Sequence, residues 1–223
     1  MDTLQMLWTE GVLGKAIWET VYMVFLSTLL SYVIGLPLGL ILTVTDKDGI
    51  HPIPVLNKVL GFIVNIFRSM PFIVLMVAML PVAKLVVGTS FGNSAMIVML
   101  VIAAAPYVAR MVESSIKEVS AGVIEAAQSM GASNFKIIYK VLIPEAKPAL
   151  IIGAVISTVT ILSYSAMAST IAAGGLGSIA IIWGHQRSKD IVTWVCVALI
   201  VLIVQVIQEV GMRIASKTDK RAK

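Results

Sequence analysis

Few residues in this sequence have the types and spacing that metal binding or catalysis requires. His51 and His185 are lone histidines, and neither has a second ligand at metal-binding spacing. The single cysteine, Cys196, lies inside an apolar run, where a small buried hydrophobe is expected. The sequence has no GxxxxGK[ST] loop to hold nucleotide phosphates, and no nucleophile with a base at an interpretable spacing. We therefore expect that the chain is not an enzyme and binds no metal or cofactor.

Hydroxyl groups are the polar chemistry that the sequence does concentrate. One apolar stretch contains Ser157, Thr158, Thr160, Ser163, Tyr164, Ser165, Ser169 and Thr170. Within it Thr160, Ser163, Met167 and Thr170 share one helical face. Such a face suits a pathway for a small zwitterion, because hydroxyls replace water around it without a fixed charge that would trap it, and Met167 is the candidate gate. Small and hydroxylated residues are also usual where membrane helices pack together, so both interpretations stay open.

Charged residues recur every few positions between Arg110 and Lys147, which distinguishes this stretch from the apolar runs on either side. Ser120 is a candidate N-cap for a helix through Met130, and Gly131 is suited to end it in the left-handed conformation. Ser133 is suited to cap a second helix that reaches about Leu142. We expect Pro144 and Pro148 to interrupt the helix that follows.

The two predicted helices of this loop each have an apolar face. Val123, Ala127 and Met130 share a face of the first, and Phe135, Ile138 and Leu142 share a face of the second. Such a helix–turn–helix can insert into a groove on a partner protein. An amphipathic helix on the membrane surface would have the same periodicity, so periodicity alone does not choose between them.

The elements that carry these residues must lie in a membrane. Hydrophobic residues make up 58% of the 223 residues and charged residues only 13%, so a soluble fold could not bury the apolar surface. The net charge of +5 comes from basic residues between and after the apolar runs, as expected for cytoplasmic loops rather than for nucleic-acid binding. The sequence predicts an all-α integral membrane protein with a single domain, residues 1–223. Its five expected spans cover residues 16–44, 57–80, 92–111, 148–173 and 191–212, and the charged loop covers about 118–147.

The distribution of basic residues predicts the orientation. One set of loops contains Lys47, Lys58, Arg110, Lys117, Lys136, Lys140, Lys147 and the tail residues Arg213, Lys217, Lys220, Arg221 and Lys223. The other set contains only Lys15, Lys84, Arg187 and Lys189. Because the richer set is expected inside, the N-terminus is predicted outside and the C-terminus inside. We expect a tight hairpin at 81–91, and residues 176–190 either re-enter the membrane or stay on its outer face.

The charged loop resembles the signature loop of ABC importer permeases. That signature is EAA, three residues, G, nine residues and I-x-L-P, and here it reads Glu125-Ala126-Ala127, then Gly131, then Val141-Leu142-Ile143-Pro144. Val141 and Ile143 depart from the signature but keep its apolar bulk. The resemblance implies that Glu125, Ala126, Ala127, Gly131 and Pro144 couple the spans to an ABC ATPase.

Three further segments are similar to methionine-importer permeases, which belong to the binding-protein-dependent type I importers. They are residues 66–72, residues 104–110, and residues 164–167 followed by Gly174-Gly175-Leu176-Gly177. The resemblance implies a homodimer in a bacterial cell membrane, two ATPase subunits that use ATP and Mg, and an extracytoplasmic substrate-binding protein. It implies a methionine substrate, with another polar amino acid or an osmoprotectant as the alternative.

A different class of function, an ion-coupled secondary transporter, also fits the composition. Such proteins use broken helices and buried carboxylates at mid-membrane. The centres of the predicted spans contain no convincing acidic residue, which disfavours this alternative.

Overall fold

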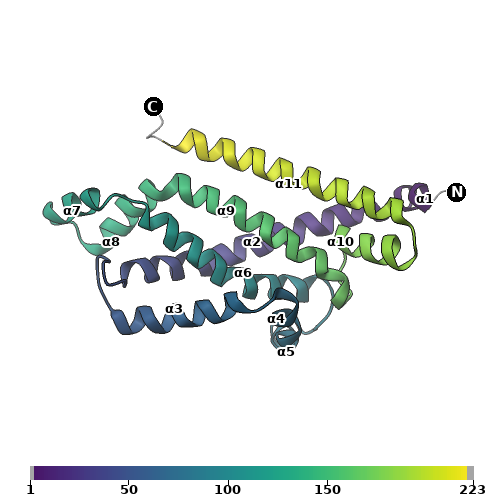
Figure 1. Ribbon diagram of the computed structural model, residues 1–223, viewed down its shortest axis with the longest axis horizontal. Coiled ribbons are helices and arrows are strands. Elements are labelled where there is room, and N and C mark those ends of the chain that lie inside the picture. The colour runs from purple at the N-terminus through teal and green to yellow at the C-terminus, as the bar shows by residue number, and fades with distance from the viewer. Residues whose placement is uncertain (1–2, 220–223) are drawn as a thin grey trace. The chain divides into compact units, whose positions relative to one another are not determined.

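The computed structural model describes residues 3–219, and every regular element in that range is a helix, as predicted (Figure 1). The α-helices are α1 (Thr3–Thr9), α2 (Val12–Val44), α3 (Pro54–Ser69), α4 (Phe72–Ala78), α5 (Leu80–Val87), α6 (Gly92–Lys117), α7 (Ala121–Ser129), α8 (Asn134–Ile137), α9 (Ile143–Ser165), α10 (Leu176–Ile179) and α11 (Asp190–Thr218). The π-helical segments are η1 (Ile138–Leu142) and η3 (Ala180–Gln186), and η2 (Ala166–Ile171) is a 3₁₀-helix. Lys220, Arg221 and Lys223, used above to predict orientation, lie outside the described residues.

Four helical stretches are long and apolar enough to cross a membrane, among the residues that the structure describes. They are Val12–Val44, Gly92–Lys117, Asn134–Ile171 and Asp190–Thr218. The pair α3 and α4 passes the same test, but the two helices meet at 105°, so the pair is either one broken span or a re-entrant segment. The fold therefore supplies four or five candidate spans, and each of the five predicted spans overlaps one of them.

The sharp bend between α3 and α4 occurs at Met70 and Pro71. Proline lacks a backbone N–H and disfavours helical geometry in the residue before it, so α3 ends at Ser69 and α4 begins after Pro71. The tight hairpin predicted at 81–91 is wrong, because α5 occupies most of that segment and ends at Gly88 in the left-handed conformation, φ 79°.

Pro144 and Pro148 do not interrupt the helix as predicted. Both lie inside α9, and the helical run from Asn134 to Ile171 continues through them. The π-helical turn η1 ends at Leu142, two residues before Pro144, and Ile143 donates its N–H to the carbonyl of Ile138, five residues back. A widened turn relieves the contact between a proline ring and the carbonyl of the preceding turn, which explains why the helix tolerates Pro144.

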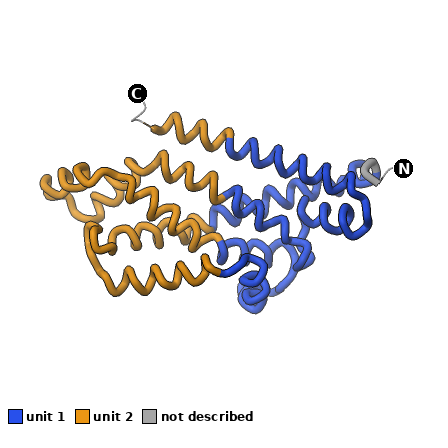
Figure 2. The backbone as a smooth tube through the Cα atoms, in the orientation of Figure 1, with its two compact units in different colours: residues 1–30, 70–103, 158–208 blue, residues 31–69, 104–157, 209–223 orange. Residues whose placement is uncertain are grey.

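The chain forms two compact units, each assembled from segments far apart in the sequence (Figure 2). The unit of residues 31–69, 104–157 and 209–223 contains the charged loop. In this unit α2 and α6 approach closely at two glycines. A Cβ atom on Gly35 would lie 2.7 Å from Val108 Cγ1, and one on Gly39 would lie 2.5 Å from the Ala109 carbonyl oxygen. Small residues that let backbones meet are typical of helix packing in membranes.

The unit of residues 1–30, 70–103 and 158–208 contains the hydroxyl-rich end of the fourth predicted span. Its apolar cluster joins α1, α2, α10 and α11 through Leu7, Leu13, Ala16, Leu176, Val192 and Cys196. Cys196 is fully buried in this cluster, as its place in an apolar run predicts.

Candidate functional site

The charged loop folds as the predicted helix–turn–helix. Ser120 precedes α7 as predicted, but its side chain makes no capping hydrogen bond, and α7 ends at Ser129. Gly131 has φ +74°, the left-handed conformation that glycine adopts without strain. Ser133 accepts a hydrogen bond from the Lys136 backbone N–H at 3.4 Å and so caps α8 as predicted.

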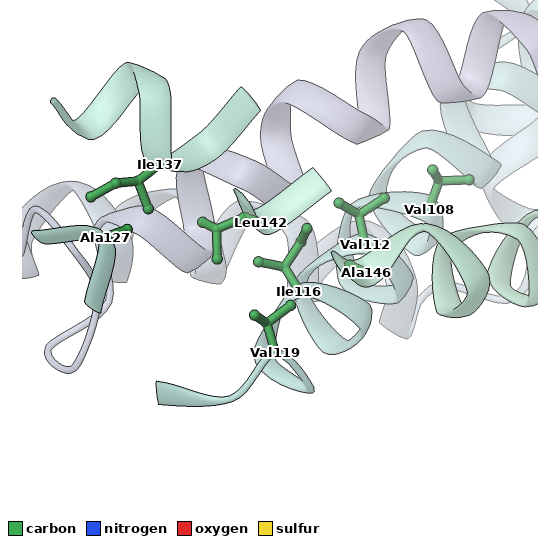
Figure 3. Packing of buried hydrophobic residues seen from close by; sticks show 8 residues of the cluster. All are labelled: Val108, Val112, Ile116, Val119, Ala127, Ile137, Leu142 and Ala146. Atoms are coloured by element: carbon green, nitrogen blue, oxygen red, sulfur yellow. The ribbon is translucent and has the colours of Figure 1, made fainter. Parts of the chain in front are cut away.

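The loop has its own apolar core, which fixes α7 against the helices around it. Side chains from α6, the residues after it, α7, α8, η1 and α9 meet in one cluster (Figure 3). The buried members are Val108, Val112, Ile116, Val119, Ala127, Ile137, Leu142 and Ala146. This core therefore packs the loop directly against α6 and α9, which belong to two of the candidate spans.

The five signature residues divide into an exposed group and one buried member. Glu125, Ala126, Gly131 and Pro144 are exposed. Ala127 is only 4% exposed and belongs to the apolar core. The four exposed residues are therefore available to a partner, while Ala127 supports the loop from within.

The two predicted apolar faces of the loop are not buried as units. Val123 and Met130 are exposed around the buried Ala127, and in the second helix Phe135 is 76% exposed while Leu142 is 2% exposed. The second face fails because η1 changes the period of the helix between these residues, so that Ile137 enters the core instead. The exposed apolar side chains of α7 and α8 remain without cover from the described part of this chain.

A chain of charges lies beside the loop, at the end of α6. The Glu113 carboxylate accepts from Arg110 Nη1 at 2.6 Å and from Lys117 Nζ at 2.9 Å, and Lys117 Nζ also donates to Asp46 at 2.5 Å. Arg110 Nη2 reaches α3, where it donates to the Gly61 carbonyl and to Asn65 Oδ1. Arg110 thus connects α6 with α3, and Glu113 links Arg110 to Lys117 along α6. The hydrogen bond from Lys117 lowers the pKa of Asp46 below its usual value.

A cavity of about 510 Å³ lies between α7, the end of α6 and the turn that follows α2. Its polar lining includes Glu125 and Gln128 of α7 together with Asp46, Asp48 and Lys117. Ile116, Ile124 and Leu142 form apolar walls. Glu125 therefore stands at the edge of a polar recess, next to the charge chain that ends at Asp46.

The predicted pathway residues lie near the junction of α9 with the 3₁₀-helix η2. Ser163, Met167 and Thr170 are exposed, with Met167 at 37%, and Thr160 and Tyr164 are partly buried. The hydroxyls satisfy backbone carbonyls of their own helix, since Ser163 donates to Val159 and Thr170 donates to Met167. The Tyr164 ring stacks on Phe72 of α4 at 4.6 Å between centroids, so this segment packs against α4.

The sequence matches the family model of the inner membrane component of binding-protein-dependent transport systems over residues 35–217. This match covers most of the chain and includes both the charged loop and the pathway segment. The chain belongs to this family. It is an inner-membrane transport component and not an enzyme.

Individual members of the family are similar over almost the full length. The probable D-methionine transport system permease protein MetI of Vibrio cholerae is 48% identical over 212 residues, 95% of this chain and 94% of the relative. The methionine import system permease protein MetP of Bacillus subtilis is 44% identical, over 94% of each chain. A chain in the inward-facing MetNI methionine ABC transporter superposes with a TM-score of 0.93 at 41% identity, over 99% of this chain and all of that one.

Sequence reasoning missed a third set of polar residues in this transport component. Glu19 and Thr20 of α2 and Asn93 of α6 accept hydrogen bonds from the backbone of the turn after η2. Glu19 lies near the start of the first predicted span, and a carboxylate there was an available signal, because ionisable groups in apolar runs are costly. No sequence spacing links residues 19 and 93 to residue 175.

Proposed function

We propose that this chain is the membrane-spanning subunit of an ATP-driven methionine importer, which transports L- or D-methionine by alternating access. The observation that carries the proposal is the 48% identity to a probable D-methionine permease, which extends over 95% of the chain. Alternative substrates are another polar amino acid or an osmoprotectant. A solved amino acid ABC transporter at 20% identity shares the fold, so the fold does not decide the substrate.

In the proposed assembly two copies of the chain form a homodimer with two ABC ATPase subunits and receive substrate from an extracytoplasmic binding protein. ATP and Mg are used by the ATPase subunits. Each copy crosses the membrane five times, with α3 and α4 as one broken span, the N-terminus outside and the C-terminus inside. The distribution of basic residues supports this orientation, and the superposition on the MetNI chain supports the assembly.

The loop of residues 118–147 is the proposed coupling element. Glu125, Ala126 and Gly131 present an exposed turn that a groove on the ATPase can hold, and Pro144 lies exposed at the start of α9. Ala127 completes the coupling set by fixing α7 on the apolar core. Coupling requires that the ATPase bind one conformation of this loop more tightly than the other.

Thr160, Ser163, Tyr164, Met167 and Thr170 form the proposed translocation pathway, with Met167 as its gate. The exposure of Ser163, Met167 and Thr170 supports this role, because a pathway at a two-fold interface needs side chains that the chain's own fold leaves uncovered. A thioether is flexible and apolar, so it can close a constriction without binding a zwitterion tightly.

Uptake by the complex in proteoliposomes tests the function. Radiolabelled methionine is offered outside with ATP inside, and L-methionine, D-methionine, polar amino acids and an osmoprotectant compete in turn. We expect ATP-dependent uptake that only the methionines suppress. Suppression by other compounds alone would assign another substrate, and uptake driven by an ion gradient without ATP would indicate a secondary transporter.

Co-purification of the ATPase tests the coupling loop. We expect Glu125→Lys and Gly131→Leu to weaken ATPase association while the chain still inserts into the membrane. Glu118→Lys is the matched control, since Glu118 is also exposed but lies outside the signature. Normal co-purification of both loop variants would refute docking at this turn.

Basal activity tests the gate. Met167→Ala should raise uncoupled transport or substrate-independent ATP hydrolysis, because a shorter side chain leaves the constriction open. Met212→Ala of α11, an exposed methionine outside the pathway, is the control. An unchanged basal rate in Met167→Ala would argue against the gate.

A further inference from the structure

The turn after η2 is held by three side chains from two other helices. Three consecutive backbone N–H groups donate to them: Gly174 to Asn93 Oδ1 at 2.7 Å, Gly175 to Glu19 Oε2 at 3.0 Å, and Leu176 to Thr20 Oγ1 at 2.9 Å. Loop backbone usually bonds to its own chain neighbours or to water. Here each of three successive donors has an acceptor supplied by a distant helix, so the geometry of this turn is over-determined.

The acceptors fit the turn closely. A Cβ atom on Gly174 would lie 1.9 Å from Glu19 Oε2, so only glycine leaves room for the carboxylate in this position. Gly175 has φ +98°, a conformation that other residues rarely adopt. Thr20 is 3% exposed, and its hydroxyl donates to the Ala16 carbonyl while accepting from Leu176, so its hydrogen-bonding capacity is used in a fixed direction.

The position of Glu19 imposes a free-energy cost of desolvation on its carboxylate. It lies eight positions into the apolar helix α2, and its side chain is 19% exposed. The nearest cation is Lys15, whose Nζ is 3.9 Å away and whose side chain is 77% exposed, so the ion pair is weak. Carboxylates in apolar helices carry a desolvation cost and by default indicate function. The contact that this carboxylate makes well is the one with Gly175.

The turn at Gly174–Leu176, held in this position, also restrains η2. A Cβ atom on Gly177 would lie 2.4 Å from the Cα of Ala166, so the backbone of α10 rests directly on the first residue of η2. Ala172, which joins η2 to the turn, has a left-handed φ of 52°, a strained conformation for a residue with a Cβ atom. The side chains that fix Gly174, Gly175 and Leu176 therefore also fix the segment that carries Met167 and Thr170.

We propose that Glu19, Thr20 and Asn93 are positioning residues for the translocation pathway, which hold η2 in the arrangement that closes it while the transporter is idle. The proposal rests on the pathway role of η2 proposed above. A carboxylate or amide that holds a backbone donor favours one conformation over another. Loss of a hydrogen bond to a charged group shifts such an equilibrium by about tenfold or more.

The test measures methionine imported per ATP hydrolysed in the reconstituted complex, normalised to the amount of assembled complex. We expect Glu19→Ala to lower this ratio by about tenfold, through a higher basal ATPase rate, because η2 is no longer held closed. Glu19→Gln keeps an acceptor oxygen and should restore most of the ratio. Lys15→Met, which removes only the long ion pair, should leave the ratio unchanged. A ratio unaffected by Glu19→Ala, or a Gln variant no better than Ala, would overturn the proposal.

If the Glu19→Ala complex does not assemble, two further pairs of variants, at Thr20 and at Asn93, test the positioning role. Thr20→Val should lower the ratio and Thr20→Ser should not, and Asn93→Ala should be worse than Asn93→Asp. Gly174→Ala should also lower the ratio, because the new methyl displaces the Glu19 carboxylate. Equal ratios within both acceptor pairs would refute the positioning role.

The two proposals fail in distinguishable ways. If η2 does not line the pathway, Met167→Ala leaves basal activity unchanged. If η2 lines the pathway but the three acceptors do not position it, Met167→Ala raises basal activity while Glu19→Ala leaves it unchanged.

Discussion

The proposed coupling loop and the turn that follows the proposed pathway segment both depend on glycine, but for different reasons. At Gly131 the reason is the backbone angle, since φ is +74° and, apart from its two chain neighbours, no described residue has an atom within 4 Å of where a Cβ would be. At Gly174 and Gly177 the reason is space, because a Cβ would collide with Glu19 and with Ala166. The first requirement is local and is visible in the sequence. The second depends on contacts between distant segments.

The polar groups of the two regions differ in the same way. In the loop, Glu125 is exposed beside a recess, and no hydrogen bond or ion pair holds its carboxylate among the described residues. Around η2, the polar groups bond to backbone, and Glu19, Thr20 and Asn93 hold a turn in place. A docking element must leave its recognition groups uncovered, whereas a gate must have its backbone fixed. The variants below test this contrast.

The largest effect is expected at the core of the loop. Ile137 is fully buried between α8 and the end of α6, so Ile137→Ala should cost about 2–5 kcal/mol through lost burial and a cavity. The measurement is the thermal unfolding midpoint of the purified chain in detergent, together with proteolysis of the loop. Phe135→Ala, at a residue 76% exposed and two positions away, should change neither. Equal shifts would show that the loop has no core of its own.

A smaller loss is expected where glycine provides space. Gly177→Ala places a methyl group against the backbone of Ala166 and should cost about 1–3 kcal/mol, the usual range for overpacking. Gly14→Ala in α2 is the control, because the described residues leave open space around its Cβ position and alanine favours the helix. Thermal unfolding compares the two. A stabilised Gly177→Ala would mean that α10 and η2 are not in direct backbone contact.

Replacement of Gly131, which is required for its left-handed backbone angle, should cost less stability than replacement of Gly177. Gly131→Ala meets no neighbour within the described chain, so its cost is the left-handed conformation alone, about 1 kcal/mol, and Gly131→Asn should cost less. Gly122→Ala inside α7 should be neutral or stabilising. Limited proteolysis at the loop and the unfolding midpoint measure the difference. A penalty in Gly131→Ala larger than that in Gly177→Ala would reverse the contrast between the two turns.

The smallest effect is expected at the charge chain. Asp46→Asn should cost at most about 1 kcal/mol, because Lys117 is partly exposed and the pair is screened. The pKa of Asp46 is lowered in the folded chain, so its contribution is present above the unfolded value of about 3.9 and is lost as the pH falls through the folded value. Unfolding midpoints of wild type and Asp46→Asn should therefore differ at neutral pH and converge in acid. Asp48→Asn, whose side chain is 82% exposed, should match wild type throughout.

Much of the loop could be predicted from the sequence because its features are local. Ser133, Gly131 and the helix before it depend on residues within one or two turns. The continuation of the helix through Pro144 could not be predicted, because it depends on the π-turn at Ile138–Leu142, and helix propensities do not distinguish π from α. The α-helical periodicity also predicted that Phe135 would face the core. Because the π-turn changes that periodicity, Ile137 faces the core instead.

The pathway region was harder to predict because its contacts are long-range. The hydroxyl-rich face identified the segment, but nothing in its spacing indicates that Glu19 and Asn93 hold the turn after it. The contacts of the charge chain are also long-range. Arg110 and Glu113 could be identified as charged residues from the sequence. The contacts of Arg110 with Gly61 and Asn65, and the link from Glu113 through Lys117 to Asp46, could be seen only in the folded chain. The span predicted over residues 57–80 took no account of Pro71, where α3 and α4 meet at 105°.

The burial of Cys196 has a practical consequence for labelling experiments. It is the single thiol of the sequence, and it is fully covered by α1, α2, α10 and α11. Water-soluble maleimides should therefore give little background on the native chain. Cysteines introduced singly at Ser163, Met167 or Thr170 would each report, by their rate of modification with and without ATP, when water reaches that side chain.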